Sequence, residues 1–202
     1  MRVLVVFGHP RHDSFNAAVL EALTRGLEDS GHEVDAADLH AEGFSPALTP
    51  EDLAAARGDG RTPSDVIAYQ ERILAAGGLA FLFPVWWFAP PAMIKGWIDR
   101  VFQEHFAFRF LEDGRVEGLL HHDRALVLAT TGAGALTYRT FGFARPMKKT
   151  LCDWTLKMSG VSKVRTVLLH RVVKADDATR HSYLEEARRL GRRYFGVEVR
   201  SS

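Results

Sequence analysis

The chain has one cysteine, Cys152, in 202 residues, so it cannot form a disulfide within itself. Cys152 lies in a segment that we expect to be helical, where a buried apolar role is commoner for a thiol than nucleophilic catalysis. The nine histidines show no metal-ligand spacing, and neither H-E-x-x-H nor C-x-x-C occurs. We therefore expect no metal site.

Signatures of several other classes are missing as well. The chain has no G-x-G-x-x-G or Walker A motif, which disfavours nucleotide binding by those modes, and no G-x-S-x-G motif of a nucleophile-elbow hydrolase. A net charge of +1 argues against nucleic acid or an anionic membrane as the main partner. The apolar run at residues 3–7 is too short for a signal segment or a membrane span. We expect a cytoplasmic protein without membrane insertion.

What the chain does have is an alternation of apolar strands and helices. Its length and its 47% of hydrophobic residues fit a single globular domain over residues 1–202. The alternation implies an α/β fold with a parallel sheet and helices on both faces, and five strands are typical of the flavodoxin-like order 2-1-3-4-5. The expected strands are residues 3–7, 33–39, 79–83, 124–131 and 163–169, a hairpin is expected at 106–116, and the main helices are 64–76, 91–102, 143–158, 175–195 and one capped by Ser14.

In such folds a ligand binds beyond the carboxyl ends of the strands, at the switch point between the first and third. Three unusual loops follow strands one, three and four, so they converge there. The first, residues 8–16, leads into a helix N-terminus whose free amides favour a phosphate. A plain capped helix is the alternative. The possible phosphate ligands are His9, Arg11, Ser14 and Asn16, and Asp13 is mildly unfavourable for an anion.

The second unusual loop carries three consecutive aromatic residues, Trp86, Trp87 and Phe88. Aromatic clusters usually belong to the core. Side chains alternate along a strand, however, so three in a row at a strand end cannot all point inward. Large exposed aromatics commonly mark a site or an interface. We therefore expect a platform for a flat ring and interpret that ring as a flavin.

The third unusual loop is residues 130–134, Thr-Thr-Gly-Ala-Gly. Its glycines let the backbone approach a ligand closely, and its hydroxyls and amides can bond a pyrimidine-like ring edge. Tyr138 and Arg139 follow within reach of the same rim. Taken alone, the segment is also consistent with a flexible glycine turn.

The chain resembles the NAD(P)H:quinone oxidoreductases of the DT-diaphorase type, which have a flavodoxin-like fold. These include bacterial drug-activity modulators and ancillary oxidoreductases of potassium-efflux systems. The resemblance rests on His9 with residues 14–16, on 83–88, on 91–102, and on 130–132 with Tyr138. It implies a flavin site between two subunits of a homodimer, with FAD as the usual cofactor and FMN in some shorter bacterial members.

The resemblance also implies a role for each loop. The first loop would hold the flavin phosphates and ribityl chain, and Thr130 to Ala133 would bond the ring edge, with Tyr138 near N1 and O2. Trp87 and Phe88 would form the apolar wall, with Trp86 less certain, and Asp99 would lie near the adenylate half, which favours FAD. The implied cofactor-binding residues are His9, Ser14, Phe15, Asn16, Pro84, Val85, Trp86, Trp87, Phe88, Asp99, Thr130, Thr131, Gly132, Ala133 and Tyr138.

One position departs from the family pattern. Members with a full charge-relay site have a histidine six residues after the position of Tyr138, where this chain has Ala144. Reduced flavin carries negative charge at N1–C2=O, which an enzyme is expected to stabilise. We hypothesise that Arg139 or Arg145 supplies that charge. Tyr138, Arg139 and Arg145 are therefore the candidate catalytic residues.

The activity that the resemblance implies is that of an NAD(P)H dehydrogenase (quinone). NADH or NADPH would pass a hydride to flavin N5, and a quinone or similar acceptor would then take two electrons in a ping-pong reaction. Azo dyes, nitroaromatics or chromate-like oxidants are alternative acceptors. A regulatory flavoprotein subunit of a potassium-efflux transporter is an alternative of another class. An electron-carrier flavodoxin is disfavoured, because such carriers are strongly acidic and this chain has a net charge of +1.

Overall fold

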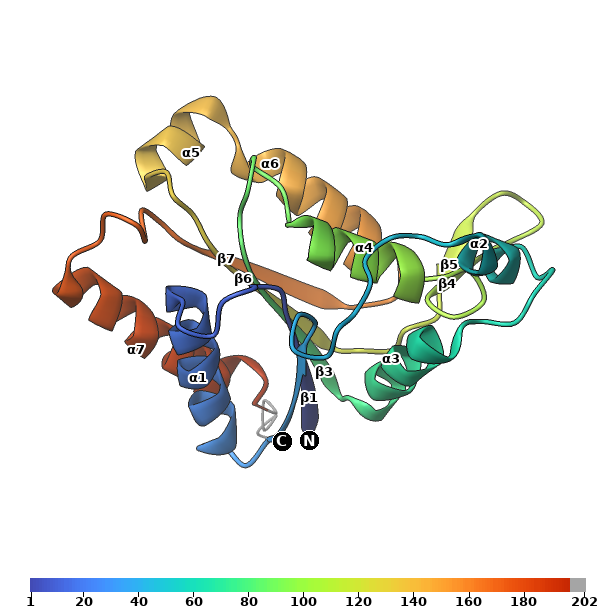
Figure 1. The fold of residues 1–202 in the computed structure, drawn as a ribbon, viewed down its shortest axis with the longest axis horizontal. Helices are drawn as coiled ribbons and strands as arrows, with labels where there is room; N and C mark the ends of the chain where they lie inside the picture. The colour runs from blue at the N-terminus through green and yellow to red at the C-terminus, as the bar shows by residue number, and fades with distance from the viewer. Residues whose placement is uncertain (197–202) are drawn as a thin grey trace, which may run out of the picture.

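The computed structural model describes residues 1–196, so the last part of the domain expected over 1–202 lies outside the described residues. A parallel five-stranded sheet in the order β2-β1-β3-β6-β7 forms the centre of the molecule (Figure 1). In chain order of the sheet strands this is 2-1-3-4-5, so the predicted flavodoxin-like topology is confirmed. The sheet strands are β1 (Arg2–Phe7), β2 (Glu33–Asp38), β3 (Gly78–Pro84), β6 (Arg124–Thr130) and β7 (Lys163–Leu169).

Helices connect the strands, and a small hairpin lies outside the sheet where one was expected. The hairpin pairs β4 (Phe108–Phe110) with β5 (Val116–Gly118). The single helix expected at 143–158 is instead a short α-helix followed by a π-helix, and one short helix, α5, was not expected. The helices are α1 (Phe15–Glu28), α2 (Pro50–Ala56), α3 (Ser64–Ala75), α4 (Ala92–Val101), α5 (Ala135–Phe141), α6 (Ala144–Met147), the π-helix η1 (Lys148–Lys157) and α7 (Asp177–Tyr194).

Helices cover both faces of the sheet (Figure 1). On one face α1 and α7 pack so closely that a Cβ at Gly26 would lie 2.1 Å from the carbonyl oxygen of Arg188. The other face carries α3, α4, α6 and η1, with the fully buried Trp97 of α4 in its core. Strands β3 and β6 are apolar along almost their whole length because both of their faces are covered.

The segment between β2 and α3 is held against α4 by one buried cation. The side chain of Arg100 is 4% exposed, and its Nε donates to Asp52 Oδ2 at 2.8 Å. Its Nη1 donates to Asp65 Oδ2 at 2.7 Å and to the carbonyl oxygen of Ser45 at 2.9 Å. Charge-assisted bonds of this kind fix an otherwise irregular segment. This segment therefore has a structural anchor and lies away from the ligand edge of the sheet.

The strand register brings three strand ends to one edge of the sheet. Phe7 of β1 lies beside Leu82 of β3, and Pro84 of β3 lies beside Thr130 of β6. The backbone N–H of Gly8 donates to the carbonyl of Leu82 at 3.0 Å. The loops that follow β1, β3 and β6 therefore begin side by side. Within residues 1–196 no helix is long and apolar enough to cross a membrane.

Candidate functional site

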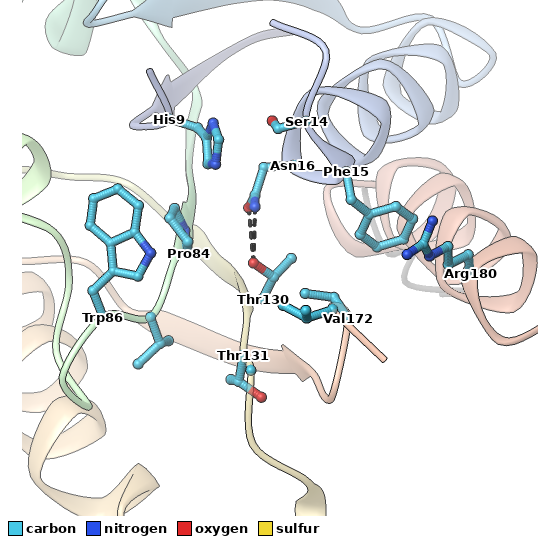
Figure 2. A pocket seen from close by; sticks show the side chains of 13 residues that line it. His9, Ser14, Phe15, Asn16, Pro84, Trp86, Thr130, Thr131, Val172 and Arg180 are labelled. Carbon is cyan, nitrogen blue, oxygen red and sulfur yellow. Dashed lines mark hydrogen bonds between the residues drawn. The ribbon is translucent and has the colours of Figure 1, made fainter. Parts of the chain in front are cut away.

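A cavity of about 470 Å³ lies at this edge, directly beyond the ends of β1, β3 and β6. Its volume is within the range of small-molecule and cofactor sites. The loop after β7 closes the side opposite Trp86 (Figure 2). The lining residues are His9, Ser14, Phe15, Asn16, Pro84, Val85, Trp86, Thr130, Thr131, Gly132, Val172, Val173 and Arg180.

The floor of the cavity is a buried polar pair. Asn16 at the start of α1 and Thr130 at the end of β6 are 5% and 1% exposed. Their side chains are joined by contacts of 3.0 Å from Asn16 Nδ2 and 3.2 Å from Asn16 Oδ1 to Thr130 Oγ1 (Figure 2). A buried pair of this kind is costly to leave half-made. It ties the N-terminus of α1 to the strand that carries the third loop.

The N-terminus of α1 faces the cavity and is suited to an anion. Ser14 is the N-cap, and its Oγ accepts from the backbone N–H of Ala17 at 3.2 Å. The first amides of a helix have no partner within it, and its dipole favours negative charge there. His9 Nδ1 accepts from the backbone N–H of Arg11 at 3.1 Å, which leaves Nε2 as the donor of the neutral ring. Burial lowers the pKa of His9, so the ring favours its neutral form.

Arg11 and Asp13, which the sequence placed near the phosphate, instead pair with each other. Arg11 Nη2 lies 2.8 Å from Asp13 Oδ2, and both side chains are well exposed. Neither residue lines the cavity. The positive charge that does line it belongs to Arg180 of α7, whose guanidinium carbon is 6.0 Å from the ring centre of Phe15. Arg180 and Phe15 are side by side at one end of the cavity (Figure 2).

Val172, Val173 and Arg180 are lining residues that the sequence analysis missed. They belong to the loop after β7 and to the first turns of α7. A signal for them was present, because the rule that ligands bind beyond strand carboxyl ends applies to the fifth strand as well. The sequence analysis used only the loops after the first, third and fourth strands.

The aromatic loop forms a tight turn in a conformation that favours glycine. Trp86 and Ala89 exchange two backbone hydrogen bonds of 3.1 Å, and the two residues between them, Trp87 and Phe88, have φ angles of 50° and 63°. Positive φ at both central positions is the pattern of a type I′ turn, usually made by Asn-Gly. Non-glycine residues held this way store strain, which is commonest at functional sites.

The turn separates the three aromatic side chains. Trp86 lines the cavity and faces His9 at a ring distance of 6.2 Å. Trp87 is 94% exposed, and Phe88 stacks on Phe143 at 3.9 Å, so neither of these two lines the cavity. The sequence analysis expected Trp87 and Phe88 to be the wall and Trp86 to be less certain. The structure instead places Trp86 on the cavity wall.

The third loop is ordered rather than a flexible glycine turn. The backbone N–H of Thr131 donates to Leu169, and Val172 donates back to Thr131, at 2.8 and 3.1 Å. Gly132 lines the cavity at negative φ, and a Cβ built there meets no atom within 4 Å. Open space beside this backbone is a cradle that a side chain would fill and a ligand can occupy.

Three predicted residues lie around this loop without lining the cavity. Tyr138 of α5 is 6% exposed; burial raises its pKa, and a hydrogen bond with the Thr131 side chain lowers it. Ala133 contributes its carbonyl, which accepts from Thr131 Oγ1 at 2.8 Å. Arg139 is exposed and does not line the cavity.

Two further predicted residues lie elsewhere. Arg145 is exposed, near the start of α6. Asp99 is on α4, where it pairs with Lys95 and borders a separate groove of about 230 Å³ between α4, the hairpin and η1. Ala144, at the position where the family has a histidine, packs against the core. Neither Arg145 nor Asp99 is therefore placed where the sequence analysis expected it within a single chain.

The fold and the cavity together define a class. A doubly wound parallel sheet with an anion-binding helix N-terminus and an apolar wall at its switch point is the architecture of a protein that binds a flat, phosphate-bearing cofactor. Among the described residues no cluster of His, Cys, Asp and Glu is arranged to hold a metal ion.

Comparison with known proteins places the chain within that class. A family model described as a flavodoxin-like fold matches residues 1–190. An uncharacterized NAD(P)H oxidoreductase of Haemophilus influenzae is 29% identical over 93% of this chain and 92% of its own length. Ribosyldihydronicotinamide dehydrogenase (quinone) of Pongo abelii is 31% identical over 70% of this chain and 68% of that protein. The solved NAD(P)H:quinone oxidoreductase of Methanothermobacter marburgensis is 34% identical with a TM-score of 0.90, covering 96% and 98% of the two chains.

The chain belongs to the flavodoxin-like-fold family. The predicted resemblance to NAD(P)H:quinone oxidoreductases is confirmed by these relatives, and so is the prediction that the protein is an oxidoreductase.

Proposed function

We propose that the protein is a flavin-dependent NAD(P)H:quinone oxidoreductase. The observation that carries the proposal is the cavity at the switch point, where one end offers a helix N-terminus and the other an aromatic side chain and an open glycine backbone. A flavin has the same division, with a phosphate at one end of a chain and a flat ring at the other. The relatives named above point to the same chemistry.

The residues present fit a flavin phosphate at the α1 end. The amides of the first turn, Ser14, and the Nε2 donor of His9 supply hydrogen bonds, and Arg180 supplies charge. The pKa of His9 is lowered by burial, so its protonated form grows as the pH falls below the usual histidine range. Protonation there adds positive charge, so phosphate affinity is expected to rise with acidity.

The flat ring fits the other end of the cavity. Trp86 offers an apolar wall, and the Gly132 backbone leaves the space opposite it open. Thr131 at the rim offers a hydroxyl to a polar ring edge. A bound flavin would supply two-electron chemistry, taking a hydride from NADH or NADPH and reducing a quinone in a second half-reaction. The chain itself binds and orients the reactants, because none of its lining residues is a redox group.

The identity of the flavin depends on Asp99, which the resemblance places near the adenylate half of FAD. Asp99 borders a groove apart from the main cavity, so a second chain would have to bring it to the cofactor. We propose FAD bound across a homodimer, with FMN as the alternative that a single chain can hold. Binding titrations with both flavins decide this: Asp99→Asn weakens FAD but not FMN under the first assignment, and affects neither under the second.

We also propose that a second copy of the chain covers an exposed apolar surface near the cavity. Phe88, Phe143 and Phe141 form a row, with ring distances of 3.9 Å and 5.4 Å, and Phe141 is 68% exposed. Leu136, on the same helix as Phe141, is 69% exposed. Contiguous exposed aromatics usually mark an interface. Analytical ultracentrifugation is expected to give a dimer that Phe141→Ser dissociates; a wild-type monomer would contradict this.

Gly132 offers a direct test of the flavin site. Its backbone has ordinary φ and free space beside it, so Gly132→Val should fold normally while filling the cavity. We expect FMN or FAD to quench tryptophan fluorescence in the wild type, with at least tenfold weaker binding in Gly132→Val and a smaller loss in Gly132→Ala. Thermal melts control for folding. Unchanged binding in Gly132→Val would remove the site from this cavity.

A further inference from the structure

A histidine that the sequence analysis did not consider lies directly behind the third loop. His170 follows the last residue of β7 and is half-buried. Its Nδ1 is 3.0 Å from Thr131 Oγ1, and its ring centre is 5.1 Å from that of Tyr138. Thr131 lines the cavity, so a single hydrogen bond separates the imidazole from the cavity wall.

The hydrogen bonds around Thr131 assign the proton on His170. Thr131 Oγ1 lies 2.8 Å from the carbonyl oxygen of Ala133 and donates its only hydrogen there. It must therefore accept from His170, which places a hydrogen on Nδ1 and leaves Nε2 free to take a proton. A second proton on the ring would then add a positive charge without breaking the bond to Thr131.

The surrounding backbone holds His170 rigidly. The hydroxyl of Tyr183 on α7 donates to the carbonyl of His170 at 2.9 Å. The next residue, Arg171, has a φ of 56°, a strained conformation for a residue with a side chain, and its N–H donates to Ala133 at 3.1 Å. The structure thus spends local strain to keep this imidazole against Thr131 and Tyr138.

The neighbours of His170 carry no negative charge. The groups that face it are Thr131 and Ala133 from the third loop, Tyr138 from α5 and Tyr183 from α7, with Arg171 as its chain neighbour. Burial lowers the pKa of His170, and the Ala133 carbonyl opposes this. The neutral ring is therefore the resting form, and new negative charge in the cavity would favour protonation.

We propose that His170 is a positioning residue that takes up one proton when a ring bound in the cavity is reduced, and so balances its negative charge through Thr131. The proposal rests on the flavin function proposed above. NAD(P)H delivers a hydride and becomes NAD(P)⁺, while a solvent proton binds His170 Nε2. When a quinone takes the hydride, that proton and one hydride-derived hydrogen complete the two O–H groups of the hydroquinone, so atoms and electrons balance.

This proposal gives a different assignment from the arginines suggested by the sequence. Arg139 and Arg145 are exposed and do not line the cavity, whereas His170 contacts both Thr131 and Tyr138. His170→Gln keeps a side-chain N–H that can reach Thr131 but cannot be protonated. His181→Gln, an exposed histidine on α7 away from the cavity, is the matched control.

The test counts protons. The flavin-loaded protein is reduced anaerobically by NADH near pH 7.5 in weak buffer with an indicator dye. Wild type and His181→Gln are expected to take up about one proton per flavin reduced, and His170→Gln much less, with flavin affinity within about twofold of wild type. Equal uptake in His170→Gln would overturn the proposal, as would loss of uptake in a variant carrying both Arg139→Ala and Arg145→Ala with normal uptake in His170→Gln.

A second measurement needs no variant. NMR titration of the wild-type His170 ring is expected to show at least tenfold higher proton affinity with reduced than with oxidised flavin bound. An unchanged titration would overturn the proposal even if His170→Gln failed to fold. A wild-type protein that binds neither flavin would overturn the proposed function and this proposal together, so the two failures are distinguishable.

Discussion

The floor of the cavity and the aromatic turn at its rim lie close together but are built in opposite ways. The floor is buried, hydrogen-bonded and unstrained, with Asn16 and Thr130 joined between α1 and β6. The turn is exposed and has two left-handed residues, Trp87 and Phe88. The floor is therefore expected to contribute both stability and ligand binding. The turn is expected to lower stability while presenting side chains at the rim.

The largest effect is expected from breaking the floor. Asn16→Leu leaves the buried Thr130 hydroxyl without its partner, which costs about 1–3 kcal/mol of the free energy of unfolding. Thr130→Val is expected to cost a similar amount. The double variant should recover much of the loss, because no unpaired polar group remains. Urea unfolding measures all three, and additive losses in the double variant would show that the pair does not act as a unit.

An intermediate effect is expected from the two neighbouring tryptophans. Trp86→Ala removes the cavity wall and should weaken flavin binding by about tenfold, which is ~1.4 kcal/mol. Trp87→Ala removes a side chain that is 94% exposed and does not line the cavity, so its effect on affinity should be under about twofold. Equilibrium dialysis with FMN and FAD compares them. A larger loss in Trp87→Ala would support the original sequence-based assignment of the wall.

The smallest effect is expected from relieving strain in the turn. Asparagine tolerates the left-handed region better than tryptophan, so Trp87→Asn should stabilise the monomer by about 0.5–1 kcal/mol. Phe88→Asn relieves the same strain but loses the stacking on Phe143, so it should destabilise the protein. Denaturation at concentrations where the chain is monomeric tests the pair. Stabilisation by both changes would mean that the stacking contributes nothing.

Local patterns were enough to predict the sheet. The runs in β1, β3 and β6 are apolar because both faces are buried, and that burial is visible in the sequence. The short helix α5 was not predicted, since it begins at Gly134 without a capping side chain and contains aromatic and β-branched residues of low helix propensity. Packing, rather than local preference, therefore determines this helix.

The floor residues of the candidate site were predicted for the same reason, because a strand end and a capped helix are local signals. The turn was not, because a sequence of Trp-Phe gives no sign of two positive φ angles that usually need Asn-Gly. Arg180 and His170 reach the site from the far end of the chain. Only the topology brings them there, so residue spacing alone could not assign them.

The central claim is most directly tested by a spectrum of the purified protein with flavin. The protein is expected to retain or take up FAD or FMN, to show flavin absorbance that NADH or NADPH bleaches without oxygen, and to regain it when a quinone is added. Asn16→Leu and Gly132→Val should fail at the binding step. A wild-type protein that takes up neither flavin, or whose bound flavin is not bleached by either nicotinamide, would contradict the account.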